Sequence, residues 1–182
     1  MKLSLPKRYN RVIARAIAEF ELIEEGDNIL VGLSGGKDSA FLLYALSILR
    51  QYAAINFKLS AITIDIGFKE EMDFSSLEEY CSMLDVPYYI KKTNIARLIL
   101  KDNVSNPCAK CSYFRKGTIA KFLEGKEFNK IAYGHHYDDA VETFLLSIIY
   151  SGQIKTFQPK SYLSASDVHV IRPLIYLREN DV

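Results

Sequence analysis

The segment Ser34-Gly35-Gly36-Lys37-Asp38-Ser39 lies between an apolar run typical of a buried strand, 28–33, and a stretch with helical periodicity, 38–51. It combines paired glycines, a helix N-terminus with free N–H groups, two hydroxyls and one lysine, all of which suit an anion. It is not a Walker A loop, because Val31 stands where that motif requires its first glycine and Asp38 where it requires Ser or Thr. We therefore predict a phosphate-binding loop in which Asp38 binds magnesium, since a carboxylate would repel a phosphate. The alternative is a plain strand-to-helix turn with a polar cap.

Strands and helices alternate along the rest of the chain. The sequence predicts strands over 28–33, 59–64, 87–90, 130–134 and 168–171, and helices over 9–23, 38–51, 73–84, 94–101, 109–124 and 138–150. This order predicts an α/β fold, a doubly wound parallel five-stranded sheet with helices on both faces. In such sheets the ligand lies beyond the carboxyl ends of the strands, which places 34–39, 65–68 and 134–139 around one crevice.

Composition narrows the class of protein. The chain has 182 residues, 49% hydrophobic and 25% charged, which suits one domain and excludes a disordered or collagen-like chain. No apolar run approaches the ~20 residues of a membrane span and no signal-peptide pattern opens the chain, so we expect a cytoplasmic protein without a membrane partner. The net charge of +1 conceals two basic stretches, Lys2–Arg15 and Lys91–Lys130. They permit a polyanion partner, and solvated helix faces are the alternative.

The segment Gly134-His135-His136-Tyr137-Asp138-Asp139 follows a predicted strand and begins a predicted helix. Three roles are open to it: a helix cap, a metal site formed by His136 and Asp139, or one wall of a nucleotide site. Its place at the same sheet edge as the phosphate loop favours the third. We therefore predict that Gly134, His135 and Asp139 contact the nucleotide, together with Asp65 at the end of another strand.

The three cysteines, Cys81, Cys108 and Cys111, are too few for a disulfide scaffold and fit a reducing compartment. Cys108 and Cys111 stand at a predicted helix start near Arg115 and Lys116, and cations and helix N–H groups make nearby thiols more reactive. One such pair cannot complete a zinc site or an iron–sulfur cluster. A redox dithiol and two incidental cysteines remain alternatives. We expect Cys81 to lie in the core.

The phosphate loop resembles the signature of the PP-loop, or N-type ATP pyrophosphatase, superfamily, which has a HUP-like fold. Four further segments follow it in order: Pro-Cys-x-x-Cys-x-x-x-Arg-Lys-Gly (107–117), Gly-His-His-x-Asp-Asp (134–139), Ser151-Gly152 through Pro159-Lys160, and Ile-Arg-Pro-Leu (171–174) with Arg178-Glu179. Together they resemble the tRNA 2-thiocytidine synthetase (TtcA) family over nearly the whole chain. The resemblance implies an N-terminal amphipathic helix, 1–25, and a PP-loop ATP-binding domain, 26–182.

The resemblance also implies an activity: adenylation of a pyrimidine C2 oxygen of tRNA, cytidine favoured, with pyrophosphate release and replacement of the oxygen by sulfur. ATP, Mg²⁺, a sulfur donor and a homodimer are expected with it. The implied catalytic residues are Lys37, Asp38, Cys108 and Cys111, and Ser34, Gly35, Gly36 and Ser39 would complete the ATP site.

In that family a 4Fe-4S cluster is held by three cysteines, two of which match Cys108 and Cys111. The third belongs to a segment beyond Arg-Pro-Leu that is not in this sequence, so we expect a fragment or a shortened relative. Lysidine and wobble-thiouridine synthetases, which share the phosphate loop, are alternatives. So is a truncated ATP-binding domain without turnover.

Overall fold

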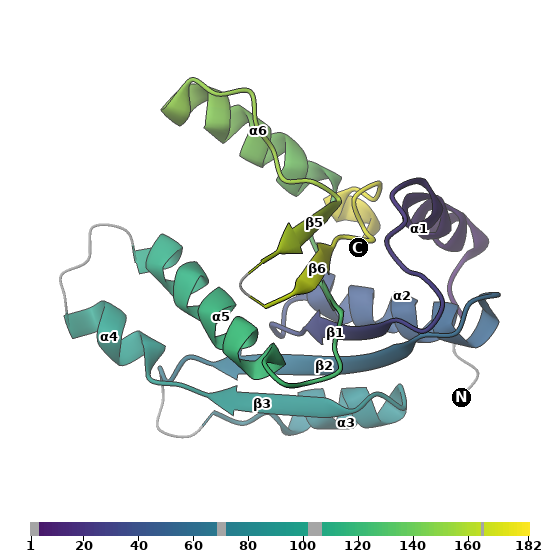
Figure 1. Ribbon diagram of the computed structural model, residues 1–182, viewed down its shortest axis with the longest axis horizontal. Coiled ribbons are helices and arrows are strands. Elements are labelled where there is room, and N and C mark those ends of the chain that lie inside the picture. Colours follow the sequence, from purple (N-terminus) through teal and green to yellow (C-terminus); the bar gives the residue numbers. More distant parts are fainter. Residues whose placement is uncertain (1–3, 69–71, 102–106, 165) are drawn as a thin grey trace.

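A computed structural model describes residues 4–68, 72–101, 107–164 and 166–182. In these residues one six-stranded sheet has the order β3-β2-β1-β4-β6-β5. Its strands are β1 (Asn28–Gly32), β2 (Lys58–Asp65), β3 (Tyr88–Lys92), β4 (Lys130–Ala132), β5 (Lys160–Leu163) and β6 (Val168–Ile171). The helices are α1 (Lys7–Glu19), α2 (Lys37–Tyr52), α3 (Ser75–Met83), α4 (Ile95–Lys101), α5 (Pro107–Leu123) and α6 (Tyr137–Ser151). The predicted doubly wound α/β fold is confirmed (Figure 1).

The predicted number of strands was wrong by one. β5 pairs antiparallel with β6, with Lys160 opposite Ile171 and Leu163 opposite Val168, and all other pairings are parallel. β5 is a four-residue edge strand without a fully buried residue, so its sequence lacks the continuous apolar run of the central strands. Only its pairing with β6 identifies it as a strand.

The core consists of two apolar clusters on opposite faces of the sheet. Successive side chains of β1 point to opposite faces of the sheet, so Ile29 and Val31 belong to one cluster and Leu30 to the other. α1, α2 and α3 cover the first face, and α4 and α5 cover the second. This two-sided cover is why the middle of β1 and nearly the whole of β2 are buried.

The first predicted helix ends earlier than its apolar periodicity indicates. α1 ends at Glu19. Glu21 adopts a φ of 49°, which a right-handed α-helix cannot accommodate. Leu22 and Ile23 are nevertheless buried, because the turn directs them into the core. The apolar pattern therefore predicted burial correctly and the helix end incorrectly.

α6 projects from the body of the molecule (Figure 1). None of its residues is fully buried in the described chain, and near its start Ala140 packs half-buried against the first cluster. Its most exposed apolar residues are Ile149, at 72%, and Tyr150, at 80%. Within the described ranges, every helix falls short of the length or apolar character that a bilayer-spanning helix requires.

Candidate active site

The phosphate loop lies between β1 and α2, at the carboxyl edge of the sheet. Gly35 adopts a φ of +83°, a conformation that glycine reaches without steric strain. Ser34 and Ser39 connect the two ends of the loop, with 3.0 Å between their hydroxyl oxygens, and Ser34 N–H donates to Ser39 Oγ at 3.1 Å. Ser34, Gly35, Gly36 and Lys37 are exposed, and the N-cap of α2, Gly36, provides no side-chain cap. The loop therefore presents free backbone N–H groups to solvent, as an anion site requires.

Gly134 brings the second predicted segment against this loop. A Cβ at Gly134 would lie 2.8 Å from both the carbonyl carbon and the oxygen of Asp38, and 3.0 Å from Ser39 N. These are backbone atoms at the start of α2, so no side-chain rotation can relieve the contact. Glycine is therefore required where the loop after β4 crosses the N-terminus of α2, and the structure places Gly134 beside the phosphate loop as the sequence predicted.

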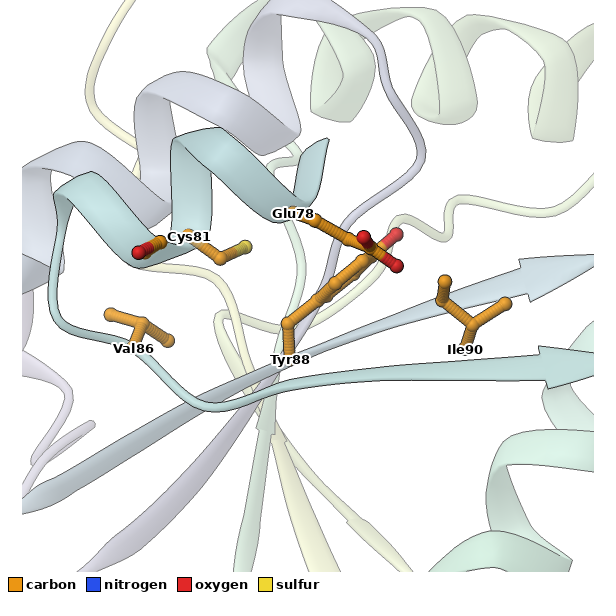
Figure 2. Close-up of a pocket in the computed structure, with 6 residues that line it drawn as sticks. Glu78, Cys81, Val86, Tyr88 and Ile90 are labelled. Carbon is orange, nitrogen blue, oxygen red and sulfur yellow. The ribbon is translucent and has the colours of Figure 1, made fainter. Parts of the chain in front are cut away.

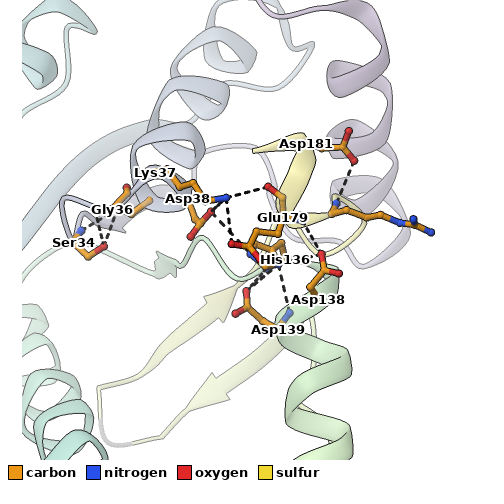
Figure 3. Close-up of polar contacts among 11 residues, drawn as sticks. Ser34, Gly36, Lys37, Asp38, His136, Asp138, Asp139, Glu179 and Asp181 are labelled. Atoms are coloured by element: carbon orange, nitrogen blue, oxygen red, sulfur yellow. Dashed lines mark hydrogen bonds and ion pairs between the residues drawn. The ribbon is translucent and has the colours of Figure 1, made fainter.

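Lys37 and Asp38 face a chain segment that sequence analysis did not place in the site (Figure 3). Lys37 Nζ donates to the backbone oxygen of Glu179 at 3.0 Å and lies 3.5 Å from its carboxylate. Glu179 N–H donates in turn to Asp138 Oδ2 at 2.6 Å. Glu179 and Asp138 are thus the site residues that were missed. The available signal was that Arg178-Glu179 belongs to the motifs that carry the family resemblance.

The residues present fit a magnesium ion at Asp38. Its Oδ1 is buried and has no hydrogen-bond donor among the described residues, although Lys37 Nζ lies 3.7 Å and His136 Nε2 4.0 Å away. The described chain holds no group of three or more metal-ligating side chains, so the ion would take its other ligands from the nucleotide and water.

The segment after β4 forms the N-terminal cap of α6. His136 N–H donates to Asp139 Oδ2 at 2.8 Å, and Asp139 N–H donates to His136 Nδ1 at 3.4 Å, which together make a capping box. Of the roles left open by the sequence, capping is the one that the structure shows for Asp139. Its contact with nucleotide stays a prediction.

His135 packs among aromatic side chains close to Arg172. Its ring lies 5.2 Å from that of Phe157 and 5.8 Å from that of Tyr133. Burial, with Arg172 next in importance, lowers the pKa of His135, and burial raises the pKa of Tyr133 to about 12. Arg172 stacks on Phe157 and donates to the Gln158 oxygen at 2.5 Å, so it connects the end of β6 with the chain leading to β5. His135 therefore has buried apolar and cationic surroundings, and its contact with nucleotide also stays a prediction.

Asp65 ends β2 and is 9% exposed. Its Oδ1 accepts a hydrogen bond from Gly67 N–H at 2.9 Å, and its backbone oxygen accepts from Thr93. The side chain thus organises the turn after β2. Binding of nucleotide by Asp65 remains a prediction.

The cysteines separate onto the two faces of the sheet. Cys81 is buried in the cluster under α3, as predicted, and burial raises its pKa to about 11. Cys111 is half-buried on α5 against the opposite cluster, so Cys81 cannot share a ligand set with it. Cys108 begins the same helix, and its side chain lies outside the described part of the structure.

A hollow beside Cys81 is a separate feature of the molecule (Figure 2). A cavity of about 340 Å³ lies between α3 and β3, lined by Glu78, Cys81, Ser82, Val86, Tyr88 and Ile90. Apart from the core residue Cys81, these residues carry no predicted role, and the phosphate loop does not line the cavity in the described chain. The candidate nucleotide site is the open edge where the phosphate loop, 134–139 and Glu179 meet.

Comparisons with known proteins agree with this geometry. Two curated relatives are the tRNA-cytidine(32) 2-sulfurtransferases of Shewanella loihica, 40% identical over 98% of this chain, and of Alcanivorax borkumensis, 41% identical over 98%. The chain spans 56% and 63% of their respective lengths.

Two solved structures share the fold. The U34-tRNA thiolase NcsA from Methanococcus maripaludis, solved with its [4Fe-4S] cluster, matches with a TM-score of 0.77 at 21% identity, covering 96% of this chain and 60% of that one. The NH3-dependent NAD synthetase from Campylobacter jejuni matches with a TM-score of 0.56 at 13% identity, covering 99% and 71%. The family model of the PP-loop domain matches residues 6–182. With the phosphate loop at the carboxyl edge of a doubly wound sheet, this match shows that the chain belongs to the PP-loop domain family.

Proposed function

We propose that this chain carries the ATP-dependent step of tRNA thiolation, adenylating a pyrimidine C2 oxygen, cytidine favoured. The observation that carries the proposal is the assembled phosphate site. Lys37, the free N-terminus of α2 and an Asp38 oxygen without a hydrogen-bond donor in the described chain meet at one edge of the sheet. Identity of about 40% to tRNA-cytidine(32) 2-sulfurtransferases supports the choice of substrate.

ATP binding would exchange contacts that the loop now makes with itself. Lys37 leaves the Glu179 oxygen for a phosphate oxygen, and the hydroxyls of Ser34 and Ser39, now bonded to each other, turn to phosphate. The α2 N-terminus and Lys37 then stabilise negative charge on the departing pyrophosphate. Magnesium bound at Asp38 would neutralise further phosphate charge.

The chemical sequence has two displacements. The C2 oxygen of the base attacks the α-phosphate, forming an O–P bond while the bond from the α-phosphate to pyrophosphate breaks. A hydrosulfide-level sulfur from the donor then attacks C2, and AMP leaves with the former oxygen. A single-stranded loop makes the base accessible, since no stacked duplex has to be opened.

The described residues do not complete an iron–sulfur site. α5 offers Cys111 and the neighbouring Cys108, Cys81 lies on the other face of the sheet, and no third thiol accompanies the pair in the described chain. A cluster needs at least one further ligand, so we route no step through it. We propose instead that the donor's hydrosulfide-level sulfur is delivered at Cys108 and Cys111 without forming a bond to either thiol, with any cluster completed from outside the residues described.

Several features of the whole protein belong to the same proposal. These are tRNA as partner, a separate sulfur donor, a homodimer and a cytoplasmic location. The division into a helix, 1–25, and an ATP-binding domain, 26–182, is also a prediction. In the structure Ile13 and Ala16 of α1 are buried in the cluster that α2 covers.

The test is the set of nucleotide products formed when anaerobic protein, ATP, magnesium and bulk tRNA are mixed. AMP and pyrophosphate that depend on tRNA, and disappear in K37A, would support the proposal. ADP and phosphate would overturn the adenylation mechanism. A C108A variant that still modifies tRNA fully would favour an amine nucleophile, as in lysidine synthesis, over sulfur. ATP binding without turnover on any tRNA would favour a nucleotide-binding domain without catalysis.

A further inference from the structure

Gly117 lies in the middle of α5, and no contact within the described chain explains a glycine at this position. Of the nine glycines, five have a positive φ, at 26, 35, 67, 125 and 152; of the other four, three have a neighbour within 4 Å of an added Cβ, at 32, 36 and 134. Gly117 has neither: its backbone is helical, and a Cβ there would meet nothing within 4 Å among the described residues. Glycine destabilises a helix interior relative to alanine, so an unneeded glycine indicates that something else requires the space.

The side chains around Gly117 are basic and aromatic. Lys110, Lys116 and Lys121 are exposed on α5, and the sequence of this helix contains four basic residues and no acidic one. Tyr113, one turn before Gly117, is 74% exposed, and its ring packs only edge-on against Phe114 at 5.8 Å. Residues three and four apart share a helix face, so Lys110, Tyr113, Gly117 and Lys121 form one stripe, with Lys116 beside it. We call these five residues the α5 face.

This combination matches the chemistry of single-stranded nucleic acid. Lysines neutralise phosphates, an exposed aromatic ring gives a base a stacking surface, and a residue without a side chain lets a sugar–phosphate backbone lie against the helix. An acidic protein surface would satisfy the lysines but would need neither the exposed ring nor the glycine. The charge and shape of the face therefore favour RNA.

We propose that the α5 face binds a single-stranded RNA segment, with the sugar–phosphate backbone crossing Gly117 and one base stacked on Tyr113. The identity of the RNA as tRNA rests on the proposed function. The same helix carries Cys111, but residues two apart point to different sides of a helix and Cys111 packs against the sheet. The α5 face therefore holds the RNA on the solvent side of α5, away from that thiol.

The variant G117A is expected to raise the melting temperature and at the same time to weaken RNA binding. Alanine fits the helix without a clash, so the variant should melt about 1–4 °C higher than the wild type. The same methyl group should weaken binding of bulk tRNA and of a 12-nucleotide single-stranded oligocytidylate, both measured without ATP, by on the order of tenfold. A variant that is only less well folded would lose both properties, so the pair of readouts separates the two causes.

Variants at two further positions test the remaining contacts. Y113A should weaken binding of the oligocytidylate by roughly tenfold or more, and Y113F should restore it, because the stacking surface remains. K116A should lower the slope of log Kd against log salt by about 1. The control is K58A, which removes an exposed lysine at the start of β2, outside α5, and should leave RNA binding unchanged.

The outcomes separate this inference from the proposed function. If G117A is stabilised and both G117A and Y113A bind RNA as the wild type does, the α5 face is not the RNA site and this inference is overturned. If the wild type itself binds neither RNA, the proposed function fails with it. Tighter or equal binding by Y113A alone would remove the stacking contact, and with it the assignment of a single strand to this face.

Discussion

Replacing Gly134 by alanine tests the contact that joins the two halves of the active site. The added methyl group would lie 2.8 Å from the Asp38 carbonyl and 3.0 Å from Ser39 N, where an ordinary contact needs at least 3.4 Å. Several tenths of an ångström must therefore be gained by separating the loop after β4 from the start of α2. Both partners are backbone, so the strain falls on the two elements that present the phosphate site.

Overpacking of this kind costs about 1–3 kcal/mol. In a chain of this size that corresponds to a melting temperature lower by roughly 2–12 °C. Because the N-terminus of α2 moves with the contact, we also expect ATP to bind more weakly, by on the order of tenfold. Urea unfolding measures the first effect, and equilibrium titration with a fluorescent ATP analogue measures the second.

G117A is the matched control, because it also adds one methyl group to a glycine but meets no neighbour within 4 Å in the described chain. It should gain about 0.5–1 kcal/mol and bind ATP as the wild type does. If G134A unfolds at the wild-type urea midpoint and keeps the wild-type Kd for ATP, the close approach of Gly134 to Asp38 is refuted.

Three further predictions concern charged groups. Burial lowers the pKa of His135 below its ordinary value of 6.5, so below about pH 6.5 the unfolded chain takes up a proton that the folded chain does not, and the free energy of unfolding falls. H135F should lose this pH dependence in urea unfolding at pH 7.5 and 5.5. If H135F keeps it, another group is responsible. K130M removes the ammonium group that lies 2.7 Å from the buried carboxylate of Asp27, and it should lower the free energy of unfolding by about 3 kcal/mol. The double variant D27N/K130M should recover part of this loss, and additive losses there would contradict the pairing. E179Q should bind ATP up to about fivefold more tightly, because ATP then displaces a weaker partner from Lys37, whereas weaker binding would show that the Glu179 carboxylate assists the nucleotide.

Much of the fold follows from local patterns. The apolar runs that form β1 and β2 predicted buried strands, and the alternation with helices predicted a parallel sheet. Cys81 was correctly assigned to the core by its place on the apolar side of a helix. These features are predictable because burial imposes a period on the sequence itself. β5 escaped prediction, because a half-exposed edge strand imposes no such period.

The sequence by itself determined the phosphate loop, since six adjacent residues between a strand and a helix contain its glycines, hydroxyls, lysine and carboxylate. Only the tertiary structure decided what surrounds that loop. Glu179 reaches Lys37 across 142 positions of sequence, Gly134 packs on Asp38, and Phe157 and Arg172 enclose His135. The physical reason is that a local motif is set by neighbours in the chain, whereas the partners of each side chain depend on how the strands order in the sheet. That order brings the ends of β1, β4 and β6 together at one edge.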